Sequence, residues 1–338
     1  MRILLLRDAR PGHYNQSEGL AAALGRHRAV EVARLAVAPR RLLKGHALRW
    51  LARSGLPAGP LLGATHGVDP AALARPDLIV SAGSDTLVAN VLLTRRFAVP
   101  NVFIGSLRGM PPGDFAAVLT IYPSLADGDR VILAAKPTPV DPDRLPPPRP
   151  IRSAADLAGA TLAVLVGGPT PNHLWAAEDW PRLAGRLAAA AGALGARLRL
   201  TTSPRTPPEA AAAFGRLADH PAVDTVALYG AAPAIPLDHF FSADAIIVTD
   251  DSATMVFEAA AARRPTVVLG APQRRPARDD EAFDALAAAG RIARLDAADL
   301  GPERLAEALA GVVPAAEHPW DALLDALGPP LSRAGLAI

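Results

Sequence analysis

The chain of 338 residues contains no cysteine, which excludes disulfides, thiol nucleophiles and thiolate metal sites. Lysine is almost absent as well. Only Lys44 and Lys136 occur, so arginine carries most of the positive charge, and arginine can bind phosphate through two parallel hydrogen bonds. Aromatic residues make up 4% of the chain and no basic-aromatic motif appears, which argues against nucleic acid as a partner. No apolar run approaches the roughly 20 residues of a transmembrane helix.

The remaining composition is that of a globular protein. Half of the residues are hydrophobic, which is ample for two cores, and the length is typical of two domains. The first residues lack the long apolar segment and the small-residue cleavage site of a signal peptide, so we expect a cytoplasmic protein. The segment 137–150 holds seven prolines and predicts a stiff, extended connection. We therefore predict domains at 1–150 and 151–317, with a tail at 318–338 that packs back on the first domain.

Short apolar runs alternate with polar loops and helical patterns in both halves of the chain. In the first half we predict strands at 3–6, 30–37, 77–81, 101–104 and 118–121, and helices at 18–24 and up to residue 97. In the second half we predict strands at 161–166, 198–202, 225–228, 245–248, 266–269 and 292–295, and helices at 179–191, 253–262, 277–289 and 302–310. Strands that alternate with helices are typical of parallel sheets. The fold class expected is α/β, with two Rossmann-like domains that have parallel sheets and face each other across a cleft.

The stretch 249–270 is the clearest strand–helix–strand unit. Asp250, Asp251 and Ser252 stand where the first strand ends and offer N-cap chemistry for the helix that follows. One interpretation is a phosphate site at the helix N-terminus, with Glu258, which shares a helix face with Thr254, accepting two ribose hydroxyls. The alternative is that the acidic and hydroxyl residues only cap the helix and Glu258 is a solvated charge. The spacing leaves both open.

The segment 7–17 predicts a polar loop after the first strand, because it contains a Pro-Gly turn signal. It lacks the GxGxxG pattern, which argues against a dinucleotide enzyme. The loop carries His13, Asn15 and Gln16. A histidine at the tip of such a loop can act as a general base, or it can be an ordinary solvated side chain.

The segment 40–53 mixes leucines and Trp50 with arginines. Such a basic amphipathic pattern is typical of helices that lie on an anionic membrane surface, but a helix with a core-facing stripe and solvated arginines gives the same pattern. The DxD at Asp127–Asp129 lies among turn residues, so we predict a loop there, and nothing else has metal-ligand spacing.

Several motifs together resemble the mitochondrial-fission ELM family, a GT-B-like group. They are Pro11-Gly12-His13 with Asn15-Gln16 and Gly19-Leu20, Val166-Gly167-Gly168-Pro169, Arg205-Thr206-Pro207, and Ala243-Asp244 through Thr249, Asp251-Ser252, Met255 and Glu258-Ala259. The C-terminal half also resembles the donor-binding half of GT-B glycosyltransferases of the MurG type. The acceptor side departs from the family pattern, because Ser84-Asp85 follow Gly83 where the family has an arginine pair. The Pro-x-His-Asp expected near Pro123 and the Asn-Pro-Tyr expected before Phe240 are also absent.

The resemblance implies a metal-independent glycosyltransferase that uses a nucleotide-diphosphate sugar as substrate and needs no cofactor. His13 or Asp8 would activate the acceptor hydroxyl, Glu258 would hold the ribose and Arg205 would approach the diphosphate. The substrate-binding residues expected are Gly12, Asn15, Gln16, Gly83, Ser84, Gly167, Gly168, Thr170, Asn172, Arg205, Asp251, Ser252, Thr254, Met255 and Glu258. The acceptor would be a lipid-linked or envelope glycan, with the protein peripheral on the inner membrane surface.

Two other functions stay open at this point. A family member can be an adaptor that keeps the fold and binds a nucleotide without doing chemistry. A nucleotide-sugar epimerase is the third option, because one epimerase type shares the fold. That reaction needs further acid and base groups, and the sequence alone does not locate them.

Overall fold

The computed structural model describes residues 1–40 and 45–338. Contacts divide these residues into two compact units, one made of 1–139 with 317–338 and the other of 140–316. The division falls before most of the proline-rich segment rather than after it. Residues 140–150 pack with the second unit because the Arg149 backbone N–H donates to Asp244 and the buried Arg264 guanidinium donates to the Pro146 carbonyl.

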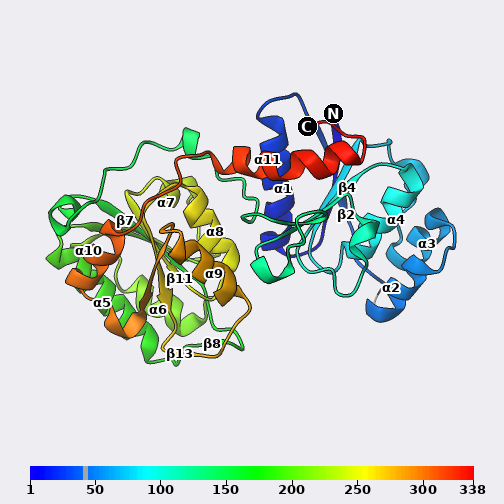
Figure 1. The fold of residues 1–338 in the computed structure, drawn as a ribbon. Coiled ribbons are helices and arrows are strands. Elements are labelled where there is room, and N and C mark those ends of the chain that lie inside the picture. The colour runs from blue at the N-terminus through cyan, green and yellow to red at the C-terminus, as the bar shows by residue number, and fades with distance from the viewer. Residues whose placement is uncertain (41–44) are drawn as a thin grey trace. The chain divides into compact units, whose positions relative to one another are not determined.

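The N-terminal unit is built from one parallel sheet and five helices of the described residues (Figure 1). Its strands are β1 Arg2–Arg7, β2 Glu31–Ala36, β3 Leu78–Ala82, β4 Asn101–Ile104, β5 Ala117–Thr120 and β6 Val131–Leu133. Its helices are α1 Pro11–Gly25, α2 Gly45–Arg53, α3 Ala58–His66, α4 Leu87–Phe97 and α11 Pro319–Arg333. The strand order is β2-β1-β3-β4-β5-β6, and every pair is parallel.

Alternate residues of β1 face opposite sides of this sheet, as the strand period of two requires. Leu4 and Leu6 pack into a cluster with side chains of α2, α3 and α4, whereas Ile3 and Leu5 pack into a second cluster with α1 and α11. The sheet is thus covered on both faces, which explains why its inner strands β1, β3, β4 and β5 are apolar and buried, whereas the edge strand β2 is mostly exposed. Trp320 of the C-terminal helix belongs to the second cluster, and its indole N–H donates to the Thr138 carbonyl.

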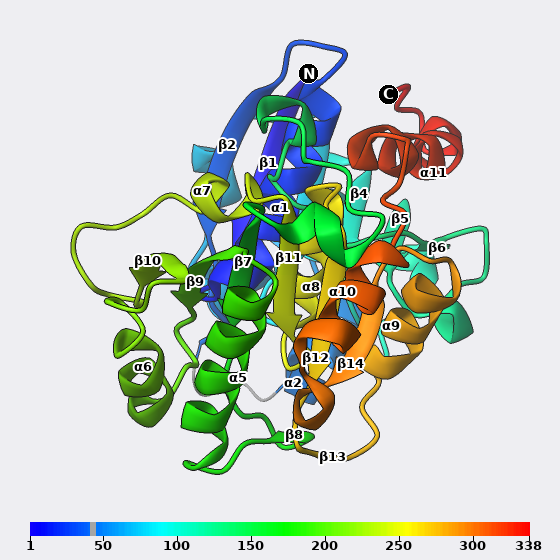
Figure 2. The same ribbon diagram turned by 90° about the vertical axis from the view of Figure 1, so that its left-hand side faces the viewer.

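The C-terminal unit repeats the pattern with a second parallel sheet (Figure 2). Its main strands are β7 Thr161–Val166, β9 Arg197–Thr202, β10 Val223–Ala227, β11 Ala245–Thr249, β12 Thr266–Gly270 and β14 Ala293–Asp296, in the order β10-β9-β7-β11-β12-β14. The helices are α5 Asp179–Ala193, α6 Pro208–Gly215, α7 Asp238–Phe241, α8 Ala253–Ala261, α9 Asp279–Ala288 and α10 Pro302–Ala310. Two short strands, β8 His173–Leu174 and β13 Gln273–Arg274, form a separate antiparallel pair.

The core of this unit lies on both faces of its sheet. Side chains of α5, α6 and α10, among them Trp180 and Phe214, pack on the residues of β7, β9 and β11 that point to one side. A right-handed crossover from β7 to β9 and another from β11 to β12 run in opposite directions along the sheet. They therefore place α5 and α8 on opposite faces.

The strands agree with the sequence predictions to within two residues, but several other elements do not. The predicted loop at 7–17 is wrong, because α1 already begins at Pro11, and proline at the first helical position has the φ that a helix needs. We also missed α3, α6, α7, β6, β8 and β13. Part of the predicted basic segment, 41–44, lies outside the described residues. The predicted cleft stays a prediction.

Candidate functional site

Each sheet has one position at which the direction of its crossovers reverses. In the N-terminal unit, β1 leads through α1 to β2 on one side and β3 leads through α4 to β4 on the other, so the reversal lies between β1 and β3. In the C-terminal unit it lies between β7 and β11 for the same reason. Ligands of open α/β sheets bind outside the carboxyl ends of the strands at this position. The candidate site is therefore expected among the residues that follow these four strands.

In the N-terminal unit, the residues after β1 and β3 form a histidine–carboxylate pair. Nδ1 of His13, in the first turn of α1, donates to Oδ2 of Asp8 over 2.6 Å. The Asp8 side chain is only 2% exposed and its other oxygen accepts the Arg10 N–H, whereas His13 is 26% exposed. A carboxylate on Nδ1 fixes the tautomer, so Nε2 is the nitrogen left to accept a proton. The arrangement matches a general base with its orienting partner.

Gly83, which follows β3, is the residue that lets this pair form. A Cβ atom placed there would lie 2.1 Å from Nδ1 of His13 and 2.8 Å from Oδ2 of Asp8, and its φ of +88° also favours glycine. Ser84 next to it is exposed and donates to Asp85. The structure thus brings His13, Asp8 and Gly83 together, as the sequence could not show.

The other N-terminal candidates lie on α1 rather than on a loop. Gly12 and Asn15 are half-buried positions of its first two turns. Gln16 is buried, and its side-chain amide donates to the Gly12 carbonyl one turn earlier. That bond occupies one of its two donor hydrogens within the helix, which limits what Gln16 can offer to a ligand.

In the C-terminal unit, the two glycines after β7 are held tightly by the neighbouring loops. The Gly167 N–H donates to the Thr249 hydroxyl over 2.8 Å and the Gly168 N–H to Oδ2 of Asp251 over 3.0 Å. A Cβ atom on Gly167 would lie 2.0 Å from Oδ2 of Asp251, and one on Gly168 would lie 2.0 Å from the Arg205 carbonyl oxygen. Both positions need glycine for close packing, and both amides are engaged inside the protein.

Asp251 lies at the centre of this contact. Its side chain is fully buried, and Oδ2 also accepts from the Arg205 guanidinium over 2.8 Å. Burial raises the pKa of Asp251, while hydrogen bonds from Thr249 and the Gly168 N–H oppose that shift. Arg205 itself is 43% exposed. A single Arg205 nitrogen makes both hydrogen bonds to Asp251, so the other guanidinium N–H groups do not take part in this contact.

The helix α8, which starts beside Asp251, has no side-chain cap. Ser252 takes the N-cap position, as the sequence predicts, but its side chain makes no cap hydrogen bond. The Asp251 carboxylate instead accepts the Gly168 N–H, and the Asp250 carboxylate accepts the Ala271 N–H. No acidic residue lies in the first turn either. The positive end of this helix therefore has neither a hydrogen bond to the Ser252 side chain nor an acidic residue in its first turn.

Further along α8, Thr254 and Met255 are half-buried and Glu258 is 8% exposed. The interpretation of Glu258 as a solvated charge is therefore wrong. Its carboxylate lies one helical turn beyond Thr254 on the same face, as their spacing predicts.

The remaining candidates, Thr170 and Asn172, form a turn. The Thr170 hydroxyl accepts the His173 backbone N–H and contacts the His173 ring over 2.8 Å, while the Asn172 carbonyl accepts the Arg275 N–H. With the β8–β13 pairing, these bonds tie the loop after β7 to the loop after β12. Thr170 and Asn172 therefore shape the edge of the site.

Sequence reasoning missed a buried charged cluster at this edge. Nε2 of His173 lies 3.8 Å and Nε of Arg274 3.4 Å from Oδ2 of Asp250, which has no hydrogen-bond partner. Arg274 also pairs with Asp280 over 2.7 Å. Burial raises the pKa of Asp250 to about 6, although the charges of His173 and Arg274 oppose the shift. The sequence singled out only Asp250, because its partners come from β8, β13 and α9, which are far apart in the chain.

The DxD segment is a turn, as predicted. Oδ1 of Asp127 accepts the backbone N–H groups of Asp129, Arg130 and Val131, all over 2.8–2.9 Å. A carboxylate oxygen with three amide donors is engaged in holding the backbone.

Comparison with known proteins gives a family. The family model described as "Mitochondrial fission ELM1" matches residues 11–318. No curated protein matches the chain. No helix within residues 1–40 and 45–338 is both long and apolar enough to cross a membrane.

Solved structures share the fold over nearly the whole chain. The glycotransferase of kitacinnamycin is 15% identical, with a TM-score of 0.52 and coverage of 99% of this chain and 97% of that one. MurG of Acinetobacter baumannii is 15% identical, with a TM-score of 0.51 and coverage of 98% and 95%. The UDP-GlcNAc 2-epimerase of Neisseria meningitidis, solved with UDP-GlcNAc, is 12% identical, with a TM-score of 0.51 and coverage of 95% and 96%. The fold is therefore GT-B-like, as predicted.

Proposed function

The chain belongs to the mitochondrial fission ELM1 family, and from this premise we propose that it is a glycosyltransferase. Its C-terminal unit would bind a nucleotide-diphosphate sugar, and its N-terminal unit would bind and activate an acceptor hydroxyl. The observation that carries the proposal is that each unit gathers its polar residues at the crossover reversal of its own sheet. Structures with this fold include a glycotransferase and an epimerase solved with a nucleotide sugar.

The donor diphosphate would lie at the start of α8. The helix terminus offers unsatisfied N–H groups and the positive end of its dipole, and no side chain caps it. Arg205 adds a guanidinium that Asp251 holds in one orientation. A preorganised positive charge stabilises the diphosphate as it leaves, which is when its negative charge increases.

Other residues would act by position. Asp251 is too deeply buried to meet a ligand, so it orients Arg205 and Gly168 rather than binding phosphate, which its own charge would repel. Gly167 and Gly168 allow the loops to approach closely. Glu258, one turn beyond Thr254 on the same face of α8, would accept hydrogen bonds from the ribose hydroxyls.

The acceptor would be activated by His13. Nε2 takes the proton from the acceptor hydroxyl while its oxygen forms a bond to the anomeric carbon. The bond between that carbon and the diphosphate oxygen breaks, and the nucleoside diphosphate leaves with the electron pair. Asp8 would stabilise the imidazolium that results, since it is buried and bonded to Nδ1. The acceptor class proposed is a lipid-linked or envelope glycan.

The proposed reaction needs no metal ion, because Arg205 and the α8 terminus would supply the positive charge that a metal supplies elsewhere. EDTA is therefore expected to leave both donor binding and transfer unchanged. Loss of transfer in EDTA, restored by Mg²⁺ or Mn²⁺, would contradict this part of the proposal.

Two alternatives share the donor site. An adaptor would bind the nucleotide and do no chemistry. An epimerase is favoured by the Asp250–His173 cluster, which supplies ionisable groups at the same sheet edge. Both side chains are at most 5% exposed, however, so they do not meet a ligand in this conformation. Epimerisation would require Asp250 and His173 to become exposed, whereas glycosyl transfer does not. We therefore prefer glycosyl transfer.

The test is a thermal-shift screen of nucleoside diphosphates and nucleotide sugars. A ligand that binds only the folded state raises the melting temperature by mass action. We expect a nucleoside diphosphate to give a shift, Glu258→Ala to reduce it and His13→Ala to keep it. If no nucleotide shifts the melting temperature, the proposal fails.

A further inference from the structure

The helices α2, α3 and α4 contain basic residues and no acidic ones. The whole chain is nearly balanced, with 33 acidic and 35 basic residues, yet the sequence has no Asp or Glu between residues 32 and 68. The helix α4 has none either and ends in Arg95 and Arg96. Since α2, α3 and α4 pack against one another on one face of the sheet, charge is strongly segregated here.

The described part of the basic segment, α2, has two different sides. Leu48 and Ala52 are buried in the core of the N-terminal unit. On the opposite side, Trp50 is 69% exposed and is the most exposed large apolar side chain among the described residues. His46 and Arg53 are exposed on the same side, because positions 46, 50 and 53 share a helix face. Neither sequence interpretation is complete, since the helix fills the core and also exposes an apolar and basic surface.

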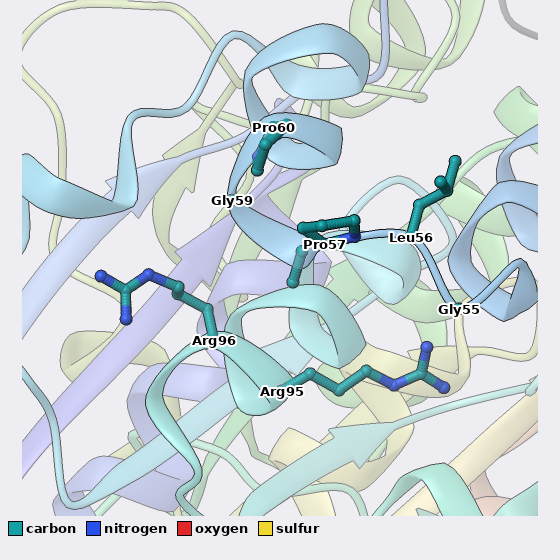
Figure 3. Close-up of a pocket in the computed structure, with 8 residues that line it drawn as sticks. Gly55, Leu56, Pro57, Gly59, Pro60, Arg95 and Arg96 are labelled. Atoms are coloured by element: carbon teal, nitrogen blue, oxygen red, sulfur yellow. The ribbon is translucent and has the colours of Figure 1, made fainter.

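A hollow lies between α4 and the segment that follows α2 (Figure 3). It measures about 390 Å³ and is lined by the segment 55–60, Arg95 and Arg96. Leu56, at its edge, is 55% exposed. Arg95 is paired with Asp114 over 2.8 Å, but neither Arg53 nor Arg96 has an ion-pair partner among the described residues.

We propose that the surface formed by His46, Trp50, Arg53, Leu56 and Arg96, here named the α2–α4 surface, docks on an anionic phospholipid bilayer. Tryptophan favours the level of the lipid headgroups, where its ring meets apolar chains and its N–H stays hydrated. Arginines in the same surface bind lipid phosphates. The hollow beside Arg96 has room for a headgroup. Nucleic acid would instead require several stacking aromatics along a basic groove, and this surface has only one.

This inference does not depend on the proposed glycosyl transfer. The α2–α4 surface contains none of the residues assigned to the donor or to the acceptor. Docking is therefore expected without any nucleotide, and its failure would leave the donor-site proposal untouched.

Tryptophan fluorescence gives a readout specific to this surface. The chain has four tryptophans, and Trp175, Trp180 and Trp320 are at most 8% exposed. A change in emission on adding vesicles thus reports Trp50. With vesicles of phosphatidylcholine and phosphatidylglycerol at low salt, we expect a blue shift and quenching by brominated lipid chains. Pure phosphatidylcholine vesicles should give neither.

Co-sedimentation with the same vesicles measures the strength of docking. Each arginine near an anionic surface contributes about 1 kcal/mol, or roughly fivefold in partition. The double variant Arg53→Ala/Arg96→Ala should therefore bind about 25-fold more weakly. The matched control is Arg182→Ala/Arg304→Ala, which removes two exposed arginines from the C-terminal unit and so lowers the net charge by the same amount as the first double variant. It should bind like the unchanged protein.

Trp50→Ala tests the apolar contribution against Tyr229→Ala, which removes an aromatic that is 64% exposed in the other unit. Only Trp50→Ala should weaken docking, and circular dichroism would check that both variants are folded. The inference is overturned if Trp50 emission does not change when anionic vesicles are added. It is also overturned if the two double arginine variants weaken binding equally. It is also overturned if Trp50→Ala converts a dimer into a monomer, which would assign the surface to a second copy of the chain.

Discussion

Replacement of Arg205 by alanine tests how the donor diphosphate is held. Arg205 is fixed by its 2.8 Å bond to the buried Asp251, and its other N–H groups remain for a ligand. A hydrogen bond to a charged group contributes about 1.5–3 kcal/mol. Loss of one such bond corresponds to roughly 10- to 150-fold in affinity. We therefore expect Arg205→Ala to weaken binding of nucleoside diphosphates by that factor, measured by calorimetry, and to weaken nucleosides without phosphate very little.

The control is Arg197→Ala. Arg197 is also half-exposed and paired with an aspartate, Asp224, but it stands at the amino end of β9, away from the strand ends that form the candidate site. The Arg197→Ala variant should therefore bind nucleotides with unchanged affinity. Equal affinities for Arg205→Ala and Arg197→Ala would refute the reasoning, because the Arg205–Asp251 pair would then be a structural contact between loops.

Three further predictions concern single residues. Glu258→Ala should weaken nucleotide binding by about tenfold to several hundredfold, because two charge-assisted hydrogen bonds to the ribose are lost; calorimetry measures this, and unchanged affinity would make Glu258 structural. Gly83→Ala should abolish transfer and spare donor binding, because the new Cβ displaces His13, whereas Gly109→Ala has a similar φ and open space and isolates the effect of strain; equal turnover of the two variants would count against the His13 assignment. Burial raises the pKa of Asp250 to about 6 from 3.8, so the folded state keeps a proton that the unfolded chain loses, and stability should fall as pH rises from about 4 to 6. Asp250→Asn should remove up to about 3 kcal/mol of that dependence in denaturant titrations, and an unchanged pH profile would contradict it.

The central strands of both sheets were predictable because they are buried on both faces. The run from Leu162 to Val166 has no polar residue, and a short run of this kind is typical of a strand in a sheet that is covered on both sides. Helix ends were harder. The Pro11-Gly12 pair serves equally as a turn or as a helix start, and α3 contains two glycines and a proline that weaken any helical pattern.

The site was only partly predictable. Motifs located Asp251, which stands between β11 and α8, His13, in the first turn of α1, and Glu258, one turn into α8. They could not show that Asp8 orients His13 or that Asp251 occupies the Gly168 amide, because these contacts depend on how loops meet at the sheet edge. For the same reason the sequence indicated Asp250 but not its partners His173 and Arg274.

Turnover of a nucleotide sugar is the most direct test of the central claim. The protein would be incubated with labelled nucleotide sugars and a lipid extract in the presence of EDTA, and both the sugar and the released nucleoside diphosphate would be followed. The proposal predicts release of the diphosphate only when an acceptor is present, with the label moving to the acceptor, and loss of both in His13→Ala. Tight nucleotide binding with no turnover on any extract, or a changed sugar configuration with no transfer, would contradict it.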